Sequence, residues 1–192
     1  MKLKSLFTVV LAAVLLLCML TGCLGAADDT QGGDRQSQQL APGAPFSDKA
    51  DMAAVINGVT YPVRVDSASV LAALGNDYDY DEVVSCVYEG YDKTFEYEDI
   101  RISTVPYDNA DIIEMITITG GDHSTTRGIK VGASRQDVIK AYGENFTSDD
   151  GYYLVYTENG DPDDPASMRI MFKMDGDTVE EICIYSPSYS NN

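Results

Sequence analysis

Residues 125–143, TTRGIKVGASRQDVIKAYG, predict a short helix with both ends marked. Ser134 is placed to cap the first turn, and Asp137, three residues later, is placed to reach back to it. The apolar face consists of Val138, Ile139 and Tyr142. Gly143 ends the helix. Because a helix of about two turns is unstable alone in water, we expect it to pack against the alternating strands that follow.

A fainter copy of this pattern lies 68 residues earlier in the chain. At that offset nine positions match between residues 63 and 102: Val63/Val131, Val70/Val138, Ala73/Ala141, Gly75/Gly143, Asp81/Asp149, Val87/Val155, Tyr88/Tyr156, Arg101/Arg169 and Ile102/Ile170. Chance predicts about two or three matches over such a length. A shift of two residues then aligns Ile116 and Ile118 with Ile182 and Ile184. We interpret the pattern as a tandem duplication, with repeats at 50–120 and 121–192.

Each repeat is expected to contain one short helix and an antiparallel sheet of three to four strands, an α+β fold. In the first repeat Asp66 occupies the cap position and Gly75 ends the helix. Alternating residues predict strands at 83–88, 93–98, 100–105 and 112–119, and in the second repeat at 152–157, 168–173 and 179–185, with a turn at Asp175-Gly176. One helix can cover only one face of its sheet, so we expect the opposite face to be open.

The N-terminal 22 residues have the layout of a secretory signal, with Lys2 and Lys4 before an apolar run. The following tetrapeptide, Leu20, Thr21, Gly22 and Cys23, resembles a bacterial lipobox. That resemblance implies cleavage before Cys23 and a diacylglyceryl lipid on its thiol, and two acyl chains give durable anchoring. The alternative is an uncleaved N-terminal membrane helix. Both interpretations place the rest of the chain outside the cytoplasm at a membrane.

The segment after the signal has the composition of a disordered linker. Residues 23–49 are rich in Gly, Gln, Asp, Ser and Pro without an apolar period, which predicts a flexible tether.

The whole chain has a formal net charge of −18, and loss of the signal removes only positive charge. Such a surface repels phosphate backbones, which excludes nucleic acid as a partner and favours a cationic one. The alternative interpretation is that the acidity only keeps an exported protein soluble.

Two cysteines remain after the signal and the lipid-bearing position, and they are Cys86 and Cys183. An extracytoplasmic pair is able to form a disulfide. Side-chain alternation argues mildly for two free thiols instead. If Ile182 and Ile184 face the core, Cys183 points the other way, whereas Cys86 aligns with Leu154, which we expect to be buried.

The stretch from Val131 to Val138, VGASRQDV, followed by Gly143, resembles the V-G-x-[S/T]-R-x-x-V…G helix of the secreted β-lactamase inhibitor proteins. It is also similar to the helix of the small lipoprotein of the outer-membrane barrel assembly machinery. The inhibitor resemblance covers residues 50–192 and implies tandem α+β units whose sheets form one concave, aromatic-lined surface that grips another protein. The assembly lipoproteins carry a single copy, unlike this chain.

In the inhibitors, a loop aspartate beside an aromatic residue enters the active site of the enzyme. Here Gly90-Tyr91-Asp92-Lys93 is expected in a comparable hairpin, although its residue order differs. The resemblance therefore implies Asp92 as the critical residue if the protein inhibits an extracytoplasmic hydrolase such as a β-lactamase.

No catalytic or metal motif stands out in the sequence. The single histidine, His123, lies in the junction between the repeats, where we expect it to be solvated. Two acidic clusters, Asp77/Asp79/Asp81 and Asp161/Asp163/Asp164, lack the glycine and glutamate that an EF-hand needs. We therefore expect no catalytic residue, metal or cofactor, and an enzyme of unknown type is the least favoured alternative.

Thirteen tyrosines and no tryptophan are the last unusual feature. Tyrosine packs well in strands and also makes adhesive, hydrogen-bonding surfaces. The residues that we expect to bind a partner, with Asp92 among them, are Tyr88, Tyr91, Asp92, Tyr97, Tyr153 and Tyr185. The sequence thus predicts a membrane-anchored lipoprotein that binds an extracytoplasmic protein through an exposed sheet face.

Overall fold

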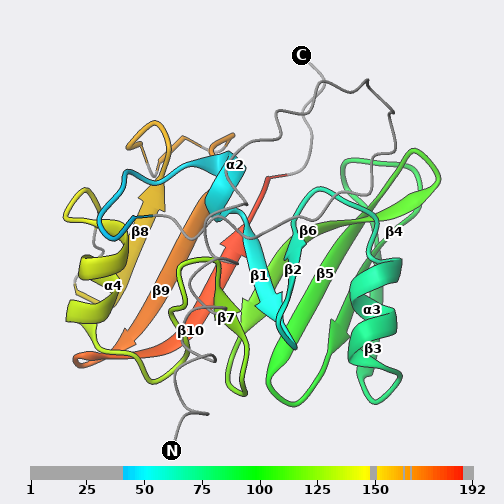
Figure 1. The fold of residues 1–192 in the computed structure, drawn as a ribbon. Coiled ribbons are helices and arrows are strands. Elements are labelled where there is room, and N and C mark those ends of the chain that lie inside the picture. Colours follow the sequence, from blue (N-terminus) through cyan, green and yellow to red (C-terminus); the bar gives the residue numbers. More distant parts are fainter. Residues whose placement is uncertain (1–40, 148–150, 162, 165, 188–192) are drawn as a thin grey trace, which may run out of the picture. The chain divides into compact units, whose positions relative to one another are not determined.

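The computed structural model describes residues 41–147, 151–161, 163–164 and 166–187, which belong to one compact unit, Ser37–Asn192. The helices are α2 (Asp48–Asp51), α3 (Ala68–Leu74) and α4 (Arg135–Tyr142). The strands are β1 (Ala53–Ile56), β2 (Val59–Pro62), β3 (Asp79–Val84), β4 (Tyr91–Glu96), β5 (Ile100–Tyr107), β6 (Ala110–Ile118), β7 (Ser124–Thr125), β8 (Tyr153–Thr157), β9 (Arg169–Asp175) and β10 (Thr178–Tyr185) (Figure 1). The fold is mixed, with antiparallel sheets dominant and little helix.

Most strands belong to one antiparallel sheet of seven, in the order β3-β4-β5-β6-β10-β9-β8. The strands that we predicted for the two repeats therefore lie in a single sheet, joined where β6 pairs with β10. A row of paired side chains crosses all seven strands and consists of Tyr80, Phe95, Ile102, Ile116, Ile184, Ile170 and Tyr156. Every member of the row except Tyr80, on the edge strand, is buried.

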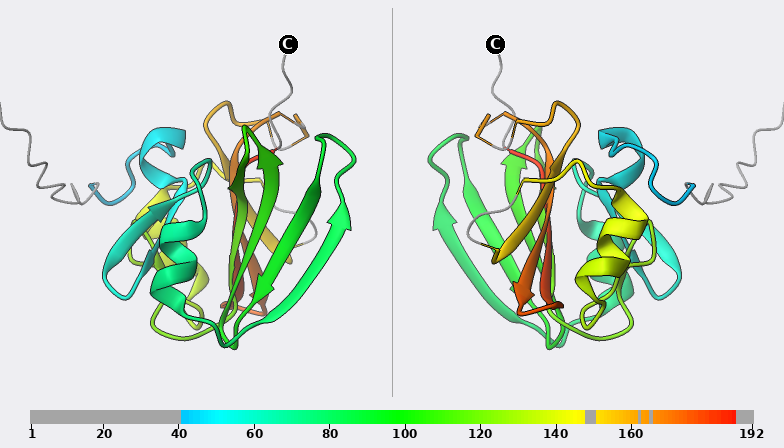
Figure 2. Two further views of the ribbon diagram at one scale, coloured as in Figure 1. Left: turned by 90° about the vertical axis from the view of Figure 1, so that its right-hand side faces the viewer. Right: turned by 90° about the vertical axis from the view of Figure 1, so that its left-hand side faces the viewer.

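The helices and a second, three-stranded sheet lie on the same side of the large sheet. Figure 2 shows α3 and α4 on that side together with β1 and β2. The small sheet has the order β2-β1-β7. Ala54 and Ile56 from β1 and Val70 from α3 join the same buried cluster as the isoleucines of the large sheet. The hydrophobic core is thus a single layer between the large sheet and these elements.

Helix α4 forms as the sequence predicts. The Ser134 side chain accepts a hydrogen bond from the Asp137 backbone N–H, and the Asp137 carboxylate accepts one from the Ser134 backbone N–H, so the capping box is complete. The helix ends at Gly143, whose φ of 86° suits glycine. Val138 and Tyr142 are buried. Helix α3 is less well capped, because its N-cap is Ser67 without a side-chain cap bond, while Asp66 accepts from the Ala68 N–H at 2.7 Å.

Strand β3 is displaced from its predicted position. The sequence predicts a strand at 83–88, whereas β3 ends at Val84 and residues 85–90 form the loop to β4. The Ser85 N–H donates to the Gly90 carbonyl at 3.0 Å and closes that loop. The reason is that β3 is exposed along its whole length, so no burial pattern marks its true start. The other predicted strands agree with the structure to within about two residues.

The packed part of the chain begins before residue 50, where we placed the start of the first repeat. Phe46 is buried in the core, and α2 begins at Asp48. The small sheet and α2 were not predicted. The lipobox-like residues Leu20, Thr21, Gly22 and Cys23 and most of the predicted tether lie outside the described residues.

Candidate functional site

The large sheet presents a second face, opposite to the helices, on which no helix or strand of the described residues lies (Figure 2). Strand alternation decides which side chains point there, because Ile102, Ile116, Ile170 and Ile184 face the core. We call this surface the open face. The side chains on it, between β4 and the edge strand β8, include Glu96, Arg101, Ser103, Met115, Thr117, Tyr153, Val155, Arg169, Met171, Lys173, Cys183 and Tyr185.

The centre of the open face is closely packed. Thr117 and Cys183 are cross-strand partners, and both are buried although they point away from the helices. Burial raises the pKa of the Cys183 thiol to about 12. Met171, the partner of Cys183 on β9, remains half-exposed. The face therefore has a dense, uncharged centre with adaptable methionine side chains beside it.

Two arginines flank this centre and are held in place by their neighbours. The Arg101 Nη2 atom lies 2.7 Å from the Glu96 Oε1 atom, and this hydrogen bond raises the pKa of Arg101. The Arg169 guanidinium donates to the carbonyl of Asp164 at 2.7 Å and lies 5.9 Å from the centre of the Tyr185 ring. The open face therefore presents fixed cationic groups on a protein that is otherwise strongly acidic.

The predicted partner-binding residues do not form one cluster. Tyr153 and Tyr185 lie on the open face, where both are half-exposed, on β8 and β10 with β9 between them. The prediction that Tyr97 lies on the open face is wrong. Its ring packs against the core side 5.3 Å from the Tyr78 ring, and its hydroxyl donates to the Gly75 carbonyl at 3.1 Å. Tyr97 follows β4 on the same parity as buried Phe95, which places it on the helix side.

The remaining predicted residues lie near the loop between β3 and β4. Tyr88 is half-buried in that loop, and its ring meets the Tyr107 ring edge-on at 5.5 Å. Tyr91 and Asp92 were expected in the hairpin loop but are the first two residues of β4, so their side chains point to opposite sides of the sheet. Asp92 points to the side of the open face. Its Oδ1 atom is buried and has no hydrogen-bond partner among the described residues.

Both cysteines are free thiols, Cys86 exposed and Cys183 buried. Cys86 was expected to match buried Leu154, and this was wrong because Cys86 lies in the loop after β3. Leu154 is buried on β8.

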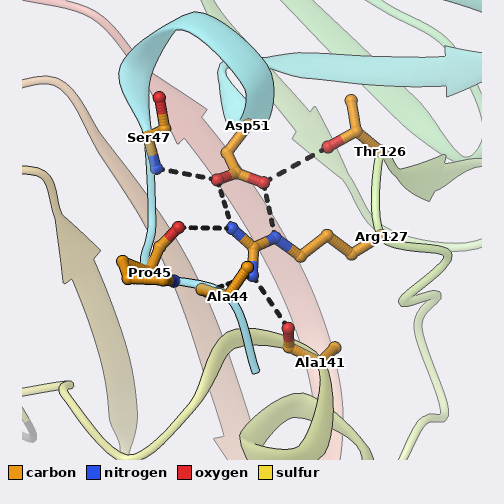
Figure 3. Close-up of polar contacts among 7 residues, drawn as sticks. All are labelled: Ala44, Pro45, Ser47, Asp51, Thr126, Arg127 and Ala141. Atoms are coloured by element: carbon orange, nitrogen blue, oxygen red, sulfur yellow. Dashed lines mark hydrogen bonds and ion pairs between the residues drawn. The ribbon is translucent and has the colours of Figure 1, made fainter. Parts of the chain in front are cut away.

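A buried ion pair joins segments far apart in the chain, as Figure 3 shows. Arg127 donates from Nε and Nη2 to the two carboxylate oxygens of Asp51, at 2.7 and 2.6 Å. Its remaining N–H groups donate to the carbonyls of Ala44, Pro45 and Ala141, at 2.6, 2.9 and 2.9 Å. All five donors of the guanidinium are therefore satisfied, which a buried arginine requires.

The carboxylate of this pair is equally well satisfied. Asp51 is fully buried and also accepts from the Ser47 N–H at 2.9 Å and the Thr126 hydroxyl at 3.5 Å. The guanidinium lies over the Tyr142 ring at 4.5 Å. The pair fastens α2 to the segment after β7 and to the C-terminal end of α4. Its role is structural, and sequence reasoning missed it because the two residues are 76 positions apart.

A hollow beside α4 offers few reactive groups. This hollow, of about 710 Å³, is lined by Arg127, Lys130, Asp137 and Lys140 together with apolar residues. Among these, Arg127 is engaged by Asp51 and Asp137 by the capping box. Within the described part of the chain, no group of three or more His, Cys, Asp or Glu side chains is arranged to hold a metal ion.

His123 differs from the expectation of a solvated side chain. It is buried, and its Nε2 atom lies 3.2 Å from the Asp99 Oδ1 atom. The cause is its position directly before β7, which pairs with β1 and draws the junction into the fold. The acidic residues near 161–164 bond mainly to local groups, for example Asp161 with the Asp163 N–H at 3.0 Å.

Comparison of the chain with protein-family models, with curated proteins and with solved structures finds no match. The family resemblance suggested by VGASRQDV therefore stays a prediction. Among the described residues, no helix has both the length and the hydrophobicity that a membrane span needs.

Proposed function

We propose that the protein is an extracytoplasmic lipoprotein, anchored in the membrane through Cys23, that binds another protein through the open face and has no catalysis of its own. The observation that carries this proposal is the one-sided layering of the fold. The described helices and the small sheet lie on one side of the seven-stranded sheet, which leaves the open face available (Figure 2). An exposed antiparallel face is common, so the proposal also depends on what the face presents.

The composition of the open face supports a protein partner. Arginine, tyrosine and methionine are enriched in the cores of protein interfaces, and the open face carries all three types: Arg101, Arg169, Tyr153, Tyr185, Met115 and Met171. The arginines are already fixed by Glu96 and by local carbonyls, so their ordering on binding costs less entropy than that of free side chains. Lysine, which interfaces disfavour, is represented there by Lys173, which lies opposite Tyr153 and forms an ion pair with Glu180 at 2.9 Å.

We further infer that the chain arose by tandem duplication and that the open face unites its two halves. The order β4-β5-β6 followed by β10-β9-β8 supports this inference, because β6 and β10 meet at the centre. Ile102 pairs with Ile116, and Ile170 pairs with Ile184, so the offset of 68 extends into β6 and β10 without the predicted two-residue shift. Arg101 and Arg169, related by the same offset, then occupy corresponding places on β5 and β9.

The repeat alignment needs a correction in the first half. Tyr88 was aligned with Tyr156, but Tyr156 pairs with Ile170 in β8 while Tyr88 lies in a loop. The residue that corresponds to Tyr156 is Phe95, which pairs with Ile102. Under duplication, β3 and the loop after it are thus additions to the first half.

A second candidate is a proteinaceous inhibitor of an extracytoplasmic hydrolase such as a β-lactamase. The observation that favours it is the Asp92 carboxylate, which points to the side of the open face with one oxygen unpaired among the described residues. Its position inside β4, behind the loop tip, weighs against deep insertion into an active site.

One experiment separates the two candidates. The full chain, solubilised in detergent, is used to capture partners from solubilised membranes and is assayed against a panel of secreted hydrolases. We expect Met171→Glu on the open face to abolish capture, and Val59→Glu, exposed on the small sheet, to leave it intact. Replacing Tyr91 and Asp92 with alanine leaves capture unchanged under the first candidate and removes inhibition under the second. Capture that survives Met171→Glu overturns the first candidate.

A further inference from the structure

Strand β3 is an edge strand of the large sheet. It pairs with β4 along its whole length, from Asp79 with Glu96 to Val84 with Tyr91. On its other side no strand of the described residues pairs with it, and all six of its residues are exposed. Natural edges are commonly blunted by proline, charged side chains or a bulge; β3 contains no proline or bulge, and all of its charged side chains are acidic.

The backbone groups that face outward can be identified. The Ser85 N–H donates to the Gly90 carbonyl, which makes Ser85 and Gly90 a hydrogen-bonded pair of the antiparallel ladder. Such pairs alternate along a ladder, so the N–H and C=O groups of Tyr80, Glu82 and Val84 point away from β4. Three donors and three acceptors are thus arranged at the spacing that an added strand requires.

The side chains of β3 define the chemistry of a complementary strand. Asp79, Asp81 and Glu82 make its first part acidic, whereas Val83 and Val84 are 57% and 71% exposed at its end. Directly opposed residues of neighbouring strands interact, and opposite charges or apolar pairs stabilise the pairing. We propose that β3 accepts, as an eighth antiparallel strand, an extended segment of a partner protein with basic residues opposite Asp79–Glu82 and apolar residues opposite the valines.

A second copy of the chain fits this edge poorly. Two β3 strands related by a twofold axis would pair outward-facing residues with each other and place Glu82 opposite Glu82 at the centre, and like charges directly opposite destabilise a strand pair. The net charge of −18 adds repulsion between whole molecules. The acidic edge instead attracts a cationic segment. This inference concerns a surface separate from the open face and does not depend on the proposed function.

The test uses a defined probe, the acetylated and amidated peptide VVKKTK, written so that its valines lie opposite Val84 and Val83 in antiparallel pairing. The ¹⁵N-labelled full chain in detergent micelles is titrated to millimolar peptide and followed by NMR. We expect saturable shifts of the Tyr80, Glu82 and Val84 amides, larger than those of Asp81 and Val83. The matched acidic peptide, VVEETE, is expected to produce none.

Variants at Glu82 separate the contribution of its backbone N–H to peptide binding from that of its side-chain charge. Glu82→Pro removes an outward N–H that β4 does not use, and unchanged amide shifts in β5 verify the fold. Loss of that hydrogen bond and of the Glu82 charge should weaken peptide binding about tenfold or more. Glu82→Gln keeps the N–H and should weaken binding only a few-fold. The double variant Asp81→Asn/Glu82→Gln, which keeps the entire ladder, should weaken it further.

The proposal is overturned by any of four results. These are the absence of saturable shifts with VVKKTK, equal responses to the basic and acidic peptides, undiminished binding by a folded Glu82→Pro variant, and undiminished binding by the double variant. Concentration-dependent dimerisation that Glu82→Pro abolishes would show that a second copy occupies the edge and would also contradict the proposal.

Discussion

Breaking the buried ion pair between Asp51 and Arg127 should be among the most damaging single changes in the fold. Replacing Arg127 with methionine leaves a fully buried carboxylate without its cation, and it also strips three backbone carbonyls of their donor. Removal of one partner of a buried pair costs about 3–5 kcal/mol. For a domain of this size, each kcal/mol lowers the melting temperature by roughly 2–4 °C, so we expect a fall of roughly 6–20 °C.

The assay is thermal unfolding of the full chain in detergent, followed by circular dichroism. Lys130→Met is the matched control, because the ion pair between Lys130 and Asp122 is largely exposed and screened by solvent, so its loss should change the melting temperature little. The double variant Asp51→Ala/Arg127→Met should be less destabilised than the sum of the two single changes, since no unpaired charge then stays buried. A melting temperature for Arg127→Met equal to that of Lys130→Met would refute this reasoning.

Three further predictions concern thiols, alkaline pH and helix capping. In the folded protein Cys86 should react rapidly with iodoacetamide at pH 8, whereas Cys183, buried and with its pKa raised to about 12, should react only after unfolding, as peptide mass spectrometry measures. Burial also raises the pKa of Tyr156 to about 12. The unfolded state therefore releases the Cys183 and Tyr156 protons at lower pH than the folded state does, so the free energy of unfolding should fall as the pH rises from about 9 to 12. A urea midpoint that stays constant across that range would contradict this. Ser134→Ala should lower the free energy of unfolding, measured in urea, by about 1 kcal/mol. Ser67→Ala breaks no side-chain cap bond and should not lose this capping contribution.

The sequence predicts best those elements whose signals are local. The capping box of Ser134 and Asp137 fixes the start of α4, and Gly143 fixes its end. Strands such as β5 and β10 are recognised because one face is buried and the other is not, which produces a period of two. The same reasoning fails for β3, where both faces are exposed.

Other features depend on contacts that no local pattern encodes. Phe46 lies in a polar stretch that resembles a tether, and only its burial shows that the domain begins there. Strand β7 has two residues, too few for any periodicity. Tyr97 and Tyr185 look alike in the sequence, yet strand parity places one against the core and the other on the open face. Tyrosine content alone therefore could not define the candidate site.

The most direct test of binding through the open face is site-specific photo-crosslinking in the cells that make the protein. A photoreactive phenylalanine analogue is placed at Met171 or Val155 on the open face and, as a control, at Val59, which is 53% exposed on the small sheet. We predict that both open-face positions give the same crosslinked protein and that Val59 does not. No adduct from the open face, or an equal adduct from Val59, would contradict the proposed function.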